Sequence, residues 1–294
     1  MKVAAIDIGG TSIKGGLLEG ETLKGLLEVP TGAREGGEHV IERAKEILHS
    51  MGTFDMIGIS TAGQVDPQKG EIRYANENIP GYTGMRIQKI MEQEFGVPTA
   101  VENDVNAAAI GESVYGAGKG YSDFLCLTYG TGVGGAIVSE GKIYRGSSFS
   151  AGEFGGIVTH GNRREVGSDP FCGCYERYAS ATALVKKAME LDERLDNGRK
   201  IFERLEESEV RAVVDQWILE ISHGLTTLIH IFNPPCIILG GGVMQQTYIL
   251  DKLKEMLYHG IMDSFRDVEL KQAQLGNKAG LLGAAWSVLE RERG

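Results

Sequence analysis

The stretch VENDVN (residues 101–106) decides how the rest of the chain is interpreted. It follows an apolar run that predicts a strand, and it precedes residues 107–112, which predict the start of a helix. Ligands of open α/β sheets bind at the carboxyl ends of strands, where a fixed carboxylate such as Asp104 can accept the proton of a hydroxyl. Asp and Asn are also preferred helix caps, so this corner alone leaves a cap and a catalytic base both open.

The composition indicates a globular protein, more readily of two domains than of one. The chain has 294 residues, of which 42% are hydrophobic and 24% charged, as in ordinary soluble proteins. A net charge of -10 argues against a nucleic-acid partner, which needs clustered Lys and Arg. We find no leader and no apolar segment of membrane-spanning length, so we expect a cytoplasmic protein without a membrane partner. Four cysteines are too few for a disulfide scaffold.

Strand and helix signals alternate along the chain. We expect strands at 3–8, 13–18, 23–29, 56–59 and 98–101, helices at 40–51 and 85–95, and a loop over 60–84. Strand, Gly-Thr turn and strand then recur at 124–139, about 120 residues after the first such unit, which suggests a weak internal duplication. The remaining predicted elements are helices at 176–191, 210–232, 249–258 and 279–292, with strands at 236–240 and 268–273.

Glycine clusters follow several of the predicted strands. Backbone N–H groups in such turns can face a phosphate, because no side chain keeps the phosphate away. Residues 130–135 match G-x-G-x-x-G, but we expect a strand after them rather than the helix that a dinucleotide fingerprint needs. Any one cluster fits an ordinary hairpin turn. Three clusters, at 9–11, 130–135 and 240–242, two of them with threonine and one preceded by Asp7, favour a single nucleotide site.

Four motifs together resemble the ROK sugar kinases of the actin, hexokinase and Hsp70 superfamily. They are Asp7-Ile-Gly-Gly-Thr11, Gly130–Gly135, Leu239-Gly-Gly-Gly242 and Glu102-Asn-Asp104, and the resemblance covers nearly the whole chain. It implies an α/β fold of two actin-like (ribonuclease H-like) domains, each a mixed five-stranded sheet flanked by helices, with the ligand cleft between them. We expect residues 1–104 plus 277–294 to form the small domain and 105–276 the large one. The resemblance also implies a homodimer.

The resemblance further implies an ATP-dependent sugar kinase and a role for each motif. Asp104 would be the catalytic base for a sugar hydroxyl, most often the 6-hydroxyl, as it attacks the γ-phosphate. Asp7 would act near Mg2+. The residues implied in ATP binding are Asp7, Gly9, Gly10, Thr11, Gly130, Thr131, Gly132, Gly241 and Gly242. The residues implied in sugar binding are Gly63, Asn78, Asn103, Asp104, Glu153 and Glu176, although Glu153 and Glu176 also fit plain surface acids.

The chain departs from the family at its zinc motif. The family pattern continues G-E-x-G-H and C-x-C-G-x-x-G-C-x-E, whose histidine and three cysteines bind a structural zinc. Here Gly156 replaces the histidine, Gly167 and Asp169 replace two cysteines, and only Cys174 stays in register. We therefore expect a zinc-free protein, because one ligand cannot build a tetrahedral site. A rearranged site is the alternative, with candidate ligands His160, Asp169, Cys172 and Cys174.

The same departure bears on the substrate. The family histidine contacts the sugar near its anomeric end, so Gly156 leaves space there, and we hypothesise that a C1 substituent, as in a β-glucoside, is tolerated. Glucose, N-acetylmannosamine, allose and fructose are not distinguished by these residues. Repressors of the family carry a helix-turn-helix, for which we find no room before the first strand. The open alternative to a kinase is a non-catalytic sugar-sensing protein of the same family.

Overall fold

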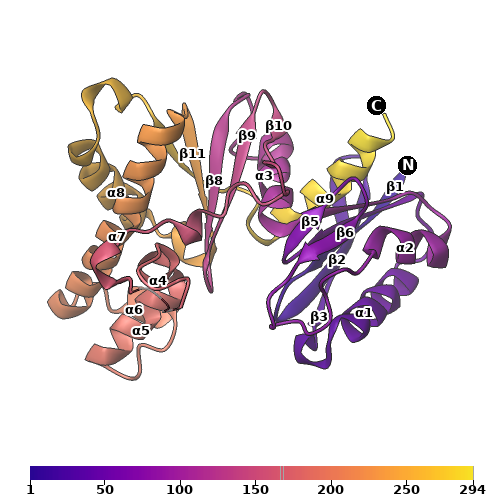
Figure 1. Cartoon of the computed structure of the whole chain (residues 1–294), viewed down its shortest axis with the longest axis horizontal. Coiled ribbons are helices and arrows are strands. Elements are labelled where there is room, and N and C mark those ends of the chain that lie inside the picture. Colours follow the sequence, from indigo (N-terminus) through magenta and orange to yellow (C-terminus); the bar gives the residue numbers. More distant parts are fainter. Residues whose placement is uncertain (166, 168, 294) are drawn as a thin grey trace. The chain divides into compact units, whose positions relative to one another are not determined.

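The computed structural model describes residues 1–165, 167 and 169–293. The chain forms two compact units. Unit 1 consists of Met1–Gly120, Ile143–Ala151 and Asn277–Gly294, and unit 2 consists of Tyr121–Lys142 and Gly152–Gly276. Figure 1 shows the elements of both units.

Unit 1 is built on a mixed sheet of five strands in the order β3-β2-β1-β4-β7. The strands are β1 (Lys2–Ile8), β2 (Ser12–Glu19), β3 (Thr22–Pro30), β4 (Met56–Thr61) and β7 (Thr99–Asn103). Strand β2 pairs antiparallel with β1 and β3, whereas β4 pairs parallel with β1 and β7. The central strands are almost fully buried, as expected where helices cover both faces of a sheet.

Two helix pairs cover the two faces of this sheet. The first pair is α1 (Gly37–Ser50) and α2 (Ile87–Phe95), whose apolar residues join those of β1 and β4 in one core. The second pair is α3 (Asp104–Tyr115) and α9 (Ala279–Arg291). Gly58 of β4 faces α9, because a Cβ added to it would lie 2.2 Å from the carbonyl oxygen of Ala284. Helix α9 therefore packs directly on β4.

Helices α3 and α9 approach each other closely at Gly283. A Cβ at this position would lie 1.7 Å from the carbonyl oxygen of Ala107 in α3, so the crossing of the two helices requires glycine. Because of this contact, unit 1 contains α3. The predicted domain boundary at residue 104 placed the same helix in the large domain.

Unit 2 repeats the plan of unit 1. Its sheet has the order β10-β9-β8-β11-β12. The strands are β8 (Phe124–Tyr129), β9 (Val133–Ser139), β10 (Lys142–Ile143), β11 (Cys236–Gly240) and β12 (Glu269–Gln272). Strand β8 pairs antiparallel with β9 and parallel with β11, and β11 pairs parallel with β12, as the corresponding strands of unit 1 do. The predicted α/β class with two mixed five-stranded sheets is confirmed, and the shared strand order supports the internal duplication.

The helices of unit 2 differ in part from the prediction. They are α4 (Glu176–Ala179), α5 (Ala181–Leu191), α6 (Gly198–Glu203), α7 (Ser208–Phe232) and α8 (Thr247–Gly260). The predicted helix over 176–191 is broken at Ser180, whose side chain caps α5 by accepting a bond from the Ala183 N–H at 3.1 Å. No helix in the described part of the chain is long and apolar enough to cross a membrane.

The prediction of a loop over residues 60–84 is also wrong in part. This segment contains a hairpin of β5 (Gln64–Asp66) and β6 (Glu71–Tyr74). Strands of three and four residues are too short to give a clear alternation of apolar and polar residues, so the pattern did not mark them.

Candidate active site

The corner that carries Asp104 is formed where edge strand β7 ends and α3 begins. Asn103 caps the helix, since its Oδ1 accepts bonds from the N–H groups of Val105 and Asn106 at 3.0 and 3.1 Å. Its Nδ2 donates to Asp104 Oδ1 at 2.9 Å and to the carbonyl oxygen of Gly63 at 3.0 Å. The cap and the candidate base are thus different residues: Asn103 caps, and the half-buried carboxylate of Asp104 is oriented by that cap.

Glu102 lies behind this corner and is only 2% exposed. Its carboxylate makes two contacts to Arg145, Nη2–Oε2 at 2.7 Å and Nη1–Oε1 at 2.8 Å. Glu102 Oε1 also accepts bonds from the Asn103 N–H at 2.9 Å and from Asn106 Nδ2 at 3.2 Å. A buried carboxylate is unfavourable unless it is paired and hydrogen-bonded, and these donors supply both conditions.

Gly63 and Asn78 line a small pocket of about 120 Å³ in unit 1, together with Gly10. Gly63 has φ 99°, and a Cβ on it would lie 2.9 Å from the carbonyl oxygen of Tyr74, so this position requires glycine. The Gly63 carbonyl also receives the bond from Asn103. Unit 1 thus brings together four residues predicted to bind the sugar and one from the first glycine turn.

Asp7 lies at the end of β1, directly before the first glycine turn. Its Oδ1 accepts a bond from Ser60 Oγ at 2.7 Å. Burial raises the pKa of Asp7, and the bond from Ser60 and the charge of Lys14 partly oppose this. A partly buried carboxylate at the carboxyl end of a strand is a suitable ligand for a hard cation such as Mg2+.

The first glycine turn, Gly9–Thr11, is held by Thr31. Thr31 Oγ1 donates to the carbonyl oxygen of Gly9 at 2.7 Å, and the Thr31 N–H donates to that of Thr11 at 3.0 Å. Gly10 is exposed, and a Cβ on it would meet no atom within 4 Å. The turn therefore has a fixed shape with open space beside it, as phosphate binding requires.

The two glycine turns of unit 2 lie against each other at the ends of β8 and β11. Gly241 has φ 106°, and a Cβ on it would lie 2.2 Å from the carbonyl oxygen of Tyr129, so only glycine allows this approach. The turn after β8 is closed by a bond from the Gly130 N–H to the carbonyl oxygen of Gly132 at 3.0 Å, and Thr131 is exposed at its tip.

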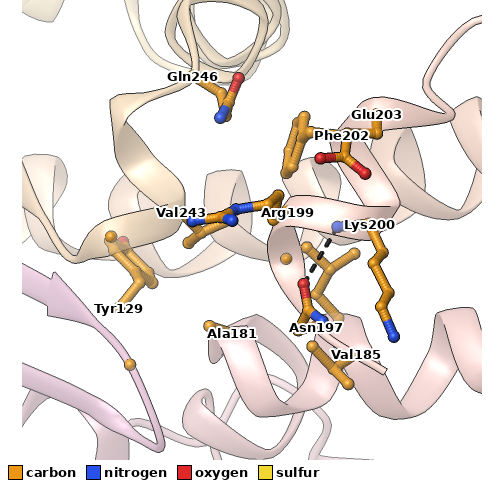
Figure 2. Close-up of a pocket in the computed structure, with 14 residues that line it drawn as sticks. Tyr129, Ala181, Val185, Asn197, Arg199, Lys200, Phe202, Glu203, Val243 and Gln246 are labelled. Carbon is orange, nitrogen blue, oxygen red and sulfur yellow. Dashed lines mark hydrogen bonds between the residues drawn. The ribbon is translucent and has the colours of Figure 1, made fainter. Parts of the chain in front are cut away.

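A pocket of about 1020 Å³ opens at these two turns and is drawn in Figure 2. It is lined by Gly130 and Gly242 from the turns and by side chains from α5, α6 and the segment after β11. Its apolar walls include Leu184, Val185, Phe202 and Val243, and its polar groups include Asn197, Arg199, Lys200 and Gln246. Mostly apolar walls with a few polar groups are typical of a site for a small molecule or nucleotide.

The polar side chains of α6 in this pocket were not predicted. A helix of six residues is too short to give a helical period. The signal that marks it is Asn197, whose Oδ1 accepts a bond from the Lys200 N–H at 3.1 Å and caps the helix (Figure 2).

Glu176 begins α4 and lies against two glycines of unit 2. A Cβ on Gly132 would lie 2.6 Å from Glu176 Oε2, and one on Gly155 would lie 3.0 Å from the same atom. Glu153 is exposed between Gly152 and Phe154, in the loop that contacts Glu176 through Gly155. The two acids differ in burial, since Glu153 is exposed and Glu176 is half-buried.

The residues considered for a metal site have other partners. His160, Asp169 and Cys172 contact, respectively, Glu220, Arg177 and the carbonyl oxygen of Arg163. Cys174 donates to the carbonyl oxygen of Gly156 at 3.3 Å. Over residues 1–165, 167 and 169–293, no group of three or more His, Cys, Asp or Glu side chains is placed to hold a metal ion. The absence of zinc stays a prediction.

The class of the protein follows from a comparison with known families. The family model described as ROK family matches residues 3–291, so the chain belongs to the ROK family. This confirms the predicted family.

Among individual proteins, the chain is 34% identical to a beta-glucoside kinase of Listeria monocytogenes over 99% of both chains. It is similar to the structure of a ROK hexokinase from Thermus thermophilus, with a TM-score of 0.82 and 34% identity over 100% of both chains. It is also similar to a ROK family glucokinase from Streptomyces griseus in complex with glucose and AMPPNP, with a TM-score of 0.83 and 32% identity over 97% of this chain and 98% of that one.

Proposed function

We propose that the protein is an ATP-dependent hexose kinase that transfers the γ-phosphate to a hydroxyl of a glucose-like sugar or a β-glucoside. The observation that carries this proposal is the Asp104 carboxylate, which the capping residue Asn103 holds at the carboxyl end of β7. The full-length similarity to a beta-glucoside kinase and to a glucokinase that binds glucose and an ATP analogue supports the same activity.

In the proposed reaction Asp104 is the general base. The hydrogen bond from Asn103 Nδ2 fixes Asp104 Oδ1, so the carboxylate is held in one orientation before the substrate arrives. The sugar hydroxyl, proposed to be the 6-hydroxyl, gives its proton to Asp104 as its oxygen bonds to the γ-phosphorus. The bond from the γ-phosphorus to the bridging oxygen breaks, and ADP leaves with that electron pair.

The proposed ATP site is the pocket of unit 2, because glycine turns adjoin apolar walls and cationic side chains of α6 there. Mg2+, when bound, neutralises charge on the phosphates. Asp7 is the residue proposed to act near it, since its carboxylate is partly buried beside the Gly9–Thr11 turn.

Three further properties belong to the same proposal. We propose that the enzyme is cytoplasmic, where ATP is available, and that it acts as a homodimer. It uses no zinc. Elemental analysis of the purified protein tests the last point directly: one equivalent of tightly bound zinc would contradict it.

A sugar panel tests the activity. We expect ATP-dependent phosphorylation of glucose or a β-glucoside, with ADP released only when sugar is present. Phosphorus NMR of the product identifies the hydroxyl that is modified. A protein that binds sugars but phosphorylates none of them would be the sugar-sensing alternative, and ADP release without sugar would indicate an ATPase.

The side chain at position 156 is expected to control acceptance of β-glucosides. Gly156 is exposed, and a Cβ on it would meet no atom within 4 Å. Gly156→His should therefore fold normally but fill the space proposed for the C1 substituent. We expect kcat/KM for a β-glucoside to fall about tenfold or more while that for glucose changes little, which steady-state kinetics measures. Equal effects on both substrates would remove the hypothesis.

A further inference from the structure

Arg145 forms a bidentate ion pair with Glu102, and most of this pair is buried. The Arg145 side chain is 27% exposed and that of Glu102 is 3% exposed. Exposed ion pairs contribute little to stability, whereas a buried pair must offset the desolvation of both charges. The two short contacts, at 2.7 and 2.8 Å, match the planar fork of an arginine on a carboxylate.

The carboxylate that Arg145 neutralises is also bonded to the catalytic corner. Glu102 Oε1 accepts the bonds from the Asn103 N–H and from Asn106 Nδ2. Among the described residues, the buried Oδ1 of Asn106 has no hydrogen-bond partner, so this amide side chain is anchored through its Nδ2. Asn103 in turn fixes Asp104 Oδ1. The hydrogen bonds therefore run without interruption from Arg145 to Asp104.

Arg145 also begins a short loop of unit 1. Its carbonyl oxygen accepts a bond from the Ala151 N–H at 3.1 Å, which closes the segment into a loop. Gly146 and Phe149 in this loop have φ 66° and 62°, an unusual conformation for phenylalanine. The ion pair to Glu102 thus fixes one end of a loop that lies within unit 1.

We propose that Arg145 is a positioning residue for phosphoryl transfer, which acts through Glu102 and Asn103 on the orientation of Asp104. This inference rests on the proposed kinase function and deepens it. Small displacements of a group that aligns reacting atoms reduce turnover strongly. Loss of the ion pair also leaves the buried Glu102 carboxylate without its partner, so we expect stability to fall together with turnover.

A pocket of about 370 Å³ in unit 1 makes this proposal testable by chemical rescue. Both Glu102 and Arg145 line it. When the Arg145 side chain is shortened, free guanidinium can therefore enter from solvent and pair with Glu102. Guanidinium has the planar donor geometry of the lost side chain, which a lysine ammonium group does not have.

The experiment compares Arg145→Ala and Arg145→Lys with a matched control, Arg86→Ala. Arg86 also pairs with a glutamate of unit 1, Glu71, at 3.2 Å, but its side chain is 66% exposed. We expect Arg145→Ala to lower kcat/KM for the sugar about 100-fold with little change in KM for ATP. A subdenaturing concentration of guanidinium should restore part of this loss. Arg145→Lys should be intermediate, and Arg86→Ala should resemble wild type with and without guanidinium.

Two kinetic results would overturn the proposal. One is wild-type kinetics for Arg145→Ala. The other is a loss that guanidinium does not restore and that is shared equally by sugar and ATP, since this would indicate a general defect in folding.

Failure of the kinase proposal is seen separately, as a wild-type protein that phosphorylates no sugar. In that case hydrogen–deuterium exchange tests the inference by itself. Faster exchange at the amides of Val105 and Asn106 in Arg145→Ala, with β8 unchanged, supports the positioning role. Unchanged exchange at both amides overturns it.

Discussion

Asp104→Asn is expected to lower kcat for sugar phosphorylation about 1000-fold while the dissociation constant for the sugar stays near the wild-type value. Asparagine has the size of aspartate, and its amide oxygen can still accept the bonds that Asp104 Oδ1 receives from Asn103 Nδ2 and from the Val105 N–H. The corner therefore keeps its shape. The amide cannot take up the proton of a hydroxyl, so the chemical step loses its base.

Asp55→Asn is the matched control for this prediction. Asp55 also belongs to unit 1 and accepts a backbone bond, from the Lys2 N–H at 2.7 Å, but it is exposed. This variant should have wild-type kcat. Single-turnover kinetics and calorimetric titration with sugar separate turnover from binding. A kcat of Asp104→Asn within about tenfold of wild type would be too small a loss for a general base and would end the assignment.

Gly283→Ala is expected to reduce the free energy of unfolding by about 3 kcal/mol. Elsewhere in a helix the same change would be favourable by up to about 1 kcal/mol, because alanine has the higher helix propensity. Here the new methyl group would lie 1.7 Å from the carbonyl oxygen of Ala107 and 2.9 Å from the backbone nitrogen of Gly111. Backbone atoms cannot rotate away, so α3 and α9 must separate. Because Asp104 begins α3, activity should fall with stability.

The control for this variant is Gly260→Ala, at the end of α8. A Cβ there would have its nearest neighbour, Thr226 Oγ1, at 3.5 Å, which is an ordinary contact. Urea unfolding of both variants beside wild type measures the difference. The same urea midpoint and slope for Gly283→Ala and wild type would show that the helix crossing tolerates a side chain and that the close approach is not required.

Long periodic segments of the fold were predictable because each carries its own signal. Strands β8 and β9 begin and end where their apolar runs do, and α7 extends only two residues beyond the predicted start. The break at Ser180 was not predictable, since part of what holds it is remote in sequence: Trp217 Nε1 donates to the carbonyl oxygens of Ala179 and Ser180. Tertiary contacts of this kind leave no local pattern.

The candidate site was predictable where a motif is contiguous. Asn103 and Asp104 are adjacent in the sequence. In the structure Asn103 caps the helix, and Asp104 stays the candidate base. Arg145 was not predicted to belong to the site, because no sequence spacing relates it to Glu102. Only the fold brings Arg145 Nη2 to 2.7 Å from Glu102 Oε2. The cationic residues of α6 were missed for a similar reason, since they become part of a pocket only when α6 packs beside the glycine turns.

The structure of the protein with a sugar and a non-hydrolysable ATP analogue is the most direct test of the account. It should show a carboxylate oxygen of Asp104 about 2.6–3.2 Å from the sugar hydroxyl that the enzyme phosphorylates. The phosphates should lie at the turns that contain Gly10, Thr131 and Gly242. A sugar bound away from Asp104, or phosphates remote from these turns, would contradict the proposed mechanism.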